Sequence, residues 1–283
     1  MVSDWKRLNP PPVLAEIFTE NPDVTVVGST EELVDLACGG PDSDEFEVYY
    51  NLPGYGRMVE ATVVRAQNGV AINYTTPYMR RRDPNAIVIG DDQPSDKKTF
   101  QDIYDQPFSE LREATLEWLK GYPLVVYAFD TGKAGLGRNA LVVAPANAGF
   151  FAFGLALLQG ILPLEEIPAN FKPASIIFVA PTFRYTHLDG KQVVVHNRRP
   201  DLHEVFSYNL YPGPSAKKAV YGILLHQGEQ EGWVTNHCSA VRVVTPYENE
   251  VVIMHEGASG AGKSEMLEQP HREDDGTLLY GEN

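Results

Sequence analysis

Hydrophobic positions recur along the chain with two spacings, and these predict alternating helices and strands. Segments with helical spacing, together with one largely apolar stretch, predict helices at 14–18, 30–38, 108–120 and 147–158. Short runs rich in β-branched and aromatic residues predict strands at 21–27, 46–50, 60–65, 70–74, 123–129 and 174–180. The two element types alternate throughout, which predicts an α/β fold with a mixed sheet, the segments between 46 and 76 included.

Turn and capping residues refine two of these segments. Thr30 is expected to be the N-cap of its helix, because acidic residues follow it, and the helix should stop at Gly39. Proline and glycine between Tyr211 and Pro214 predict a loop that presents Lys217 and Lys218.

Composition narrows the class of protein. With 283 residues, 43% of them hydrophobic and 22% charged, the chain is typical of a globular protein with one large or two ordinary domains. It has neither an apolar run of about 20 residues nor a signal-like N-terminus, and Cys38 and Cys238 suggest no disulfide framework, so we expect a cytoplasmic protein without a membrane partner. The net charge of −15 argues against a nucleic-acid partner.

One sequence motif indicates the class of ligand. Gly257, Ala258, Ser259, Gly260, Ala261, Gly262, Lys263 and Ser264 match the phosphate-binding loop GxxxxGK[ST]. The run 250–254 predicts a buried strand before the loop, and 263–268 a short helix after it, ended by Pro270. Glycines allow backbone N–H groups to surround phosphate oxygens, Lys263 suits the β- and γ-phosphates, and Ser264 suits a divalent metal. The motif predicts a nucleoside triphosphate ligand.

Three further clusters precede the loop. They are the basic run Arg80-Arg81-Arg82, the segment from Tyr211 to Lys218, and His237-Cys238. Arginines on a turn can bind a carboxylate or phosphate with two hydrogen bonds. Taken singly, the arginine run is equally well explained as a solvated surface run, whereas the other two clusters are better explained as solubilising lysines and a packed histidine.

Together, the order and spacing of these clusters resemble the ATP-dependent form of phosphoenolpyruvate carboxykinase. The resemblance rests on His237-Cys-Ser-Ala240 upstream of the loop, Lys218 and Tyr211 before it, and Arg82-Asp-Pro84 leading to Asp91-Asp92. Val125–Phe129 and Phe171–Pro173 are also similar, so that the likeness covers roughly residues 70–283. It implies an N-terminal carboxykinase-like substrate domain over 1–225, followed at 226–283 by the beginning of a P-loop nucleotide-binding domain.

The resemblance also implies roles. Arg82 would bind a small dicarboxylate substrate, with Tyr211 lining its pocket. Lys218 and His237 would bind Mn²⁺, whereas Lys263 and Ser264 would handle ATP phosphates and Mg²⁺. Glu282 would stand in for a metal-binding aspartate. The implied reaction is phosphoryl transfer from ATP to the enolate of oxaloacetate, and the full reaction yields phosphoenolpyruvate, ADP and CO₂.

Two alternatives stay open. The sequence Lys263-Ser264-Glu265 at the end of the loop resembles that of HPr kinase/phosphorylase, a P-loop protein kinase. A non-catalytic nucleotide- or anion-binding module would need only the loop and the basic clusters. We further expect the chain to be a fragment with little activity alone. The choice between ATP and GTP and the oligomeric state stay open.

Overall fold

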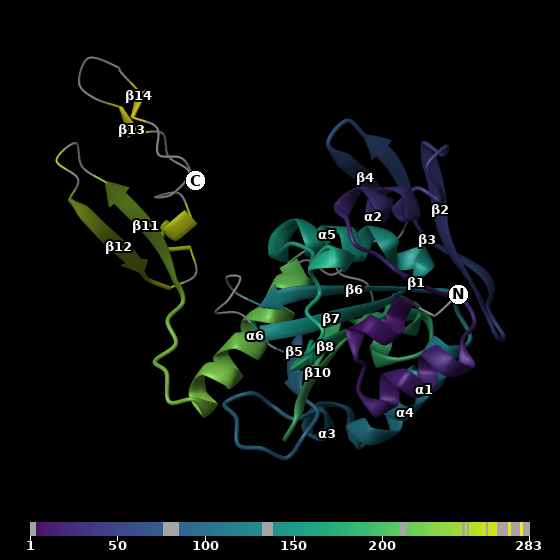
Figure 1. Ribbon diagram of the computed structural model, residues 1–283. Helices are drawn as coiled ribbons and strands as arrows, with labels where there is room; N and C mark the ends of the chain where they lie inside the picture. The colour runs from purple at the N-terminus through teal and green to yellow at the C-terminus, as the bar shows by residue number, and fades with distance from the viewer. Residues whose placement is uncertain are drawn as a thin grey trace. The chain divides into compact units, whose positions relative to one another are not determined.

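A computed structural model describes residues 4–75, 85–131, 138–209, 214–244, 247, 249–258, 260–264, 271–272 and 278–279. They belong to two compact units, Met1–Leu224 and Leu225–Asn283 (Figure 1). Among the described helices, none has the length and apolar character needed to cross a membrane.

The first unit is built around a seven-stranded mixed sheet. Its strands, in spatial order, are β1 (Val24–Val26), β6 (Leu124–Thr131), β7 (Arg138–Pro145), β8 (Ser175–Ala180), β10 (Leu202–Tyr208), β9 (Val193–Arg199) and β5 (Ile87–Ile89). The central strands β7, β8 and β10 are parallel, whereas β6 and β9 pair antiparallel with β7 and β10. The predicted α/β class with a mixed sheet is therefore confirmed.

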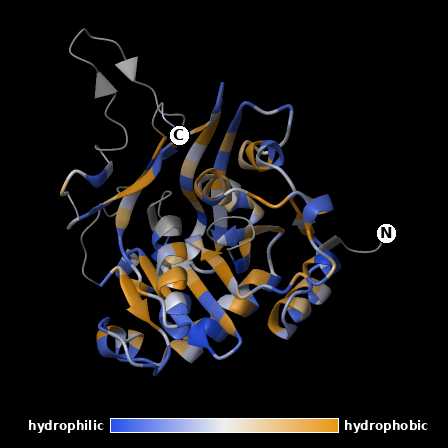
Figure 2. Cartoon of the chain, turned by 60° about the vertical axis from the view of Figure 1, so that its left-hand side comes forward, coloured by the Kyte–Doolittle hydropathy of each residue, from blue (hydrophilic) through white to orange (hydrophobic). Residues whose placement is uncertain are grey.

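Helices cover both faces of this sheet, because consecutive strand residues point to opposite sides. One face packs against α1 (Pro12–Glu20), α3 (Phe100–Tyr104) and α4 (Phe108–Lys120), preceded by the 3₁₀ turn η1 (Asp4–Leu8). The other face packs against α2 (Thr30–Ala37), α5 (Gly149–Gln159) and α6 (Pro214–Gln230). Apolar residues accordingly concentrate on the central strands and the inner sides of the helices (Figure 2). The remaining 3₁₀ turns are η2 (Ala146–Ala148), η3 (Leu164–Glu166), η4 (Pro181–Tyr185) and η5 (Leu188–Gly190).

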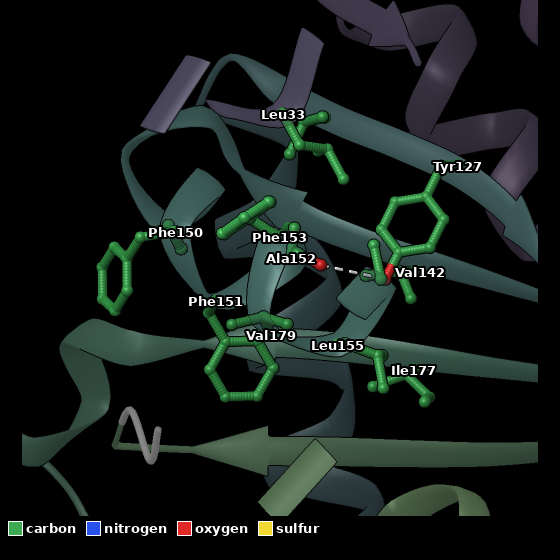
Figure 3. Packing of buried hydrophobic residues seen from close by; sticks show 14 of the residues in the cluster. Leu33, Tyr127, Val142, Phe150, Phe151, Ala152, Phe153, Leu155, Ile177 and Val179 are labelled. Carbon is green, nitrogen blue, oxygen red and sulfur yellow. Dashed lines mark hydrogen bonds between the residues drawn. The ribbon is translucent and has the colours of Figure 1, made fainter. Parts of the chain in front are cut away.

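β6, β7 and β8 are buried on both faces along most of their length and are therefore largely apolar. In β6, Tyr127 points to the α5 side, where its hydroxyl donates to the carbonyl of Ala152 at 3.1 Å (Figure 3). Phe151 and Phe153 of α5 belong to the same buried cluster, in which Phe151 lies beside Val179. The predicted apolar helix is thus confirmed, although Leu157 at its C-terminal end is 61% exposed.

The segments between 46 and 76 form strands, but the prediction that they join the mixed sheet is wrong. β2 (Glu45–Leu52), β3 (Gly56–Ala66) and β4 (Gly69–Tyr74) make a separate three-stranded antiparallel sheet. Short turns connect these strands, so each pairs with its neighbour in sequence. Val48, Ala61 and Val63 bury one side of this sheet in the core that α2 and α5 share.

The N-cap of α2 also differs from the prediction. Ser29, not Thr30, occupies the cap, and its hydroxyl accepts a hydrogen bond from the Glu32 backbone N–H at 3.2 Å. Thr30 is the first helical residue. At the other end Gly39 adopts φ +80°, a left-handed conformation that glycine tolerates, as expected for a helix stop.

The second unit contains two small antiparallel sheets. β11 (Cys238–Val244) pairs with β12 (Glu250–Glu256), and β13 (His271–Arg272) pairs with β14 (Leu278–Leu279). The predicted strand before the phosphate loop is confirmed as β12, but its predicted burial is wrong, since Val252 is 60% and Met254 54% exposed. Among the described residues β12 pairs only with β11, so its apolar side chains stay accessible.

Candidate functional site

The phosphate loop follows β12 and is organised by its glycines and its lysine. Gly260 and Gly262 adopt φ of +86° and +82°, which other residues rarely tolerate. The Lys263 ammonium folds back across the turn and donates to the carbonyl oxygens of Gly257 at 2.6 Å and Ala258 at 2.9 Å. The ammonium that is predicted to meet the triphosphate is therefore held against the loop backbone. Ser264 is exposed beside it, and Ser259 lies outside the described residues.

The β11–β12 ladder brings His237 to this loop. In the antiparallel register Cys238 pairs with Glu256, the last pair of the ladder. His237 immediately precedes Cys238, and Gly257 immediately follows Glu256, so the histidine and the first loop glycine leave the ladder at the same end. Two motifs that are separate in sequence thus become neighbours. The His237 side chain is exposed and accessible from solvent.

A second histidine, His255, occupies the neighbouring position of the ladder and was not predicted from the sequence. Ser239 pairs with His255, and the Ser239 hydroxyl lies 3.4 Å from Nδ1 of His255. His255 stands two residues before Gly257. Because side chains alternate along a strand, this spacing was the available signal that it faces the same side as the first loop residue.

Lys218 lies in the first unit, on α6, and this corrects the predicted loop. The helix begins at Pro214, because proline is tolerated in the first turn, where its missing N–H would be unpaired in any case. Alanine and lysine then favour helix, and Ala219, Val220 and Ile223 anchor it in the core. Lys218 itself is half-buried in the second turn. His237, Lys263 and Ser264 belong to the second unit.

The expected substrate residues Arg82 and Tyr211 lie outside the described residues, as does Glu282. The described residues that border the first two can be placed. After the arginine cluster, the carbonyl of Ala86 accepts from the Val194 N–H at 2.8 Å. Before Tyr211, the Asn209 side-chain amide donates to the Lys191 carbonyl at 2.5 Å. Ala86 and Asn209 therefore both lie beside the start of β9.

The described residues provide some, but not all, of the ligands that the expected metals would need. A serine hydroxyl beside phosphate oxygens is an oxygen-rich environment of the kind that Mg²⁺ prefers. Of the two residues expected to bind Mn²⁺, Lys218 belongs to the first unit and His237 to the second. Across the described ranges, no group of three or more His, Cys, Asp or Glu side chains forms a metal cage by itself.

Comparison with known proteins places the chain in a family. No curated protein gives a significant match. A family profile described as "Domain of unknown function (DUF4914)" matches residues 11–283, which is nearly the whole chain. The chain therefore belongs to the family described as Domain of unknown function (DUF4914).

Proposed function

We propose that this protein binds ATP at residues 257–264 and catalyses a phosphoryl transfer of the phosphoenolpyruvate carboxykinase type. The observation that carries the proposal is the β11–β12 register, which sets His237 at the end of the ladder where the phosphate loop begins. A glycine-rich turn without a ligand would not require a histidine at that position. The same histidine belongs to the segment that resembles the carboxykinases.

Each residue has a chemical role in this proposal. The loop N–H groups and Lys263 would hold the β- and γ-phosphates, and Ser264 would ligate Mg²⁺. His237 would bind Mn²⁺, and such an ion neutralises the charge that develops on the transferred phosphoryl group. The resemblance gives Lys218 the role of a metal ligand as well. Lysine ligates only as the neutral amine, so this role requires the field of a cation to favour deprotonation.

The acceptor proposed is a small dicarboxylate, with oxaloacetate as the first choice. The bond between the β-carbon and its carboxylate breaks and releases CO₂, and its electron pair forms the enolate. The enolate oxygen then attacks the γ-phosphorus of ATP, and ADP leaves. Arg82 and Tyr211 would orient the dicarboxylate, and the described residues that border both meet beside β9.

A coupled assay of the whole natural protein with Mn²⁺, ATP and oxaloacetate tests the proposal. We expect turnover to fall by at least about a hundredfold in the double variant Lys218→Ala/His237→Ala, since even outer-shell partners of a metal affect activity by 10–100-fold. Lys98→Ala removes an exposed cation elsewhere and is the matched control. Full activity in the double variant would overturn the assignment.

The same preparations distinguish the alternatives. Incorporation of γ-phosphate into a protein, without consumption of oxaloacetate, would replace the carboxykinase proposal with a protein kinase of the HPr kinase type. Saturable ATP binding without any turnover would reduce the function to a nucleotide-binding module.

A further inference from the structure

A pocket lies in the first unit, at the opposite end of β10 from the start of α6. It forms where the segment 9–13, which leads into α1, the turn 172–173 before β8, and the β9–β10 turn 199–202 meet. Its volume is about 650 Å³, within the range of small-molecule sites. Seven residues of β10 separate the start of that strand from its end, which corresponds to roughly 20 Å. The pocket therefore lies at the opposite end of β10 from Asn209 and the start of α6.

The walls are apolar and conformationally fixed. Five prolines line the pocket together with Val13 and Leu202, namely Pro10, Pro11, Pro12, Pro173 and Pro200. Proline has a locked φ and no N–H, so these walls offer hydrophobic surface without unpaired donors. The Asn9 side-chain amide donates a hydrogen bond to the carbonyl of Phe171 at 3.1 Å, which links the segment 9–13 to the turn at 172–173. Because the site is already ordered, ligand binding would have a small cost in conformational entropy.

The rim carries two cations, which is unusual in a chain of net charge −15. Lys172 and Arg199 are exposed, and within the described part of the chain neither forms a salt bridge. The adjacent Arg198 provides the contrast, because it is held by Asp91 at 2.7 Å and by the carbonyl of Gln93. Arg199, on the opposite side of the same strand, is free to meet a ligand.

The acidic residues of the pocket do not cancel this charge. Glu204 is fully buried beneath the pocket, and its carboxylate accepts from Arg112 at 2.6 and 2.8 Å and from the Asn197 side-chain amide at 2.7 Å. These partners neutralise the Glu204 carboxylate and fix its position at the base of the pocket. Among the described residues that line the pocket, Asp201 is the one exposed carboxylate.

We propose that this pocket binds a small organic anion with an apolar body. The anionic group would lie against Lys172 and Arg199, and the body would bury itself against the proline walls. Charge alone would not select this ligand, since inorganic anions leave the apolar walls uncovered. Apolar surface alone would not select it either, because an uncharged analogue leaves the rim cations without a counter-charge.

Calorimetric titration of the full chain with octanoate and with octanol tests this pairing. We expect octanoate to bind with one site per chain and octanol to bind at least about tenfold more weakly. The double variant Lys172→Gln/Arg199→Gln should weaken octanoate by about tenfold, because each exposed ion pair contributes a few-fold. Lys97→Gln/Lys98→Gln removes two exposed charges outside the pocket and should leave the affinity unchanged.

Several results would overturn the proposal. These are the absence of octanoate binding, equal binding of octanoate and octanol, or equal effects of the two double variants. A hexaglutamate peptide that bound where octanoate did not would assign the pocket to acidic peptides instead. The comparison of octanoate with octanol uses the unmodified chain, so it decides the matter even if a variant fails to fold. No nucleotide is present, so the outcome is independent of the proposed phosphoryl transfer.

Discussion

Replacement of Arg184 by methionine would remove the charged partner of a buried carboxylate. Glu60 on β3 is 0% exposed, and it accepts from Arg184 at 2.9 Å and from the Tyr185 hydroxyl at 2.8 Å. This contact links the three-stranded sheet to η4, at the end of β8. Breaking a buried pair by removing one partner destabilises a protein by about 3–5 kcal/mol at neutral pH. In a unit of this size that corresponds to a fall in Tm of roughly 6–20 °C.

The pH dependence provides a second, more specific readout. Burial raises the pKa of Glu60 even though Arg184 and the Tyr185 hydroxyl act to lower it. The folded state therefore binds this proton more tightly than the unfolded chain, and the contribution of Glu60 to stability falls as pH rises through its folded pKa. Without Arg184 the pKa rises further, so the stability deficit of Arg184→Met should be larger at pH 7 than at pH 5.

Thermal unfolding followed by circular dichroism at both pH values measures this deficit. Arg57→Met is the matched control, because its partner Glu47 is about half exposed and the pair should contribute at most about 1 kcal/mol. A deficit under 1 kcal/mol at pH 7, or one that grew toward pH 5, would show that Arg184 does not stabilise the charged form of Glu60.

Two further pairs of variants test local features of the fold by the same unfolding assay. Ser29→Ala should cost about 1 kcal/mol through loss of the α2 N-cap, whereas Thr30→Ala should have little effect; equal effects would contradict the assignment of the cap. Gly222→Ala should destabilise by about 1–3 kcal/mol because a Cβ there would overlap the His196 ring. Gly154→Ala, with no atom within 4 Å of the added carbon, should be neutral or stabilising by up to about 1 kcal/mol, and a reversed order would show that packing around α6 is looser than described.

The sequence predicted elements well wherever burial produced a clear apolar pattern. β6, β8, α4 and α5 fall close to the expected ranges, because both faces of a central strand and the inner side of a helix must be apolar. The separation of β2, β3 and β4 from the main sheet could not be predicted, since strand pairing depends on contacts between segments distant in sequence. The α6 helix was missed because proline and glycine near 211–214 resembled a loop, while its stabilising contacts with the core are tertiary.

The candidate site was predictable in part. The glycines and Lys263 follow from local chemistry, and the positive φ values of Gly260 and Gly262 agree with the need for glycine there. The adjacency of His237 to the loop required the β11–β12 register, which no local pattern specifies. The roles of Arg82, Tyr211 and Glu282 stay predictions, since these residues lie outside the described ranges.

The proposed function requires that residues 257–264 bind a nucleoside triphosphate beside His237. Calorimetric titration of the chain with Mg²⁺ and ATP measures this binding, with Lys97→Ala as the control for the loss of a lysine and Lys263→Ala as the test variant. We expect saturable binding that weakens in the order ATP, ADP, AMP and falls by more than about tenfold in Lys263→Ala, because that ammonium neutralises the β- and γ-phosphates. Absence of ATP binding, or equal affinity in Lys263→Ala and Lys97→Ala, would contradict it.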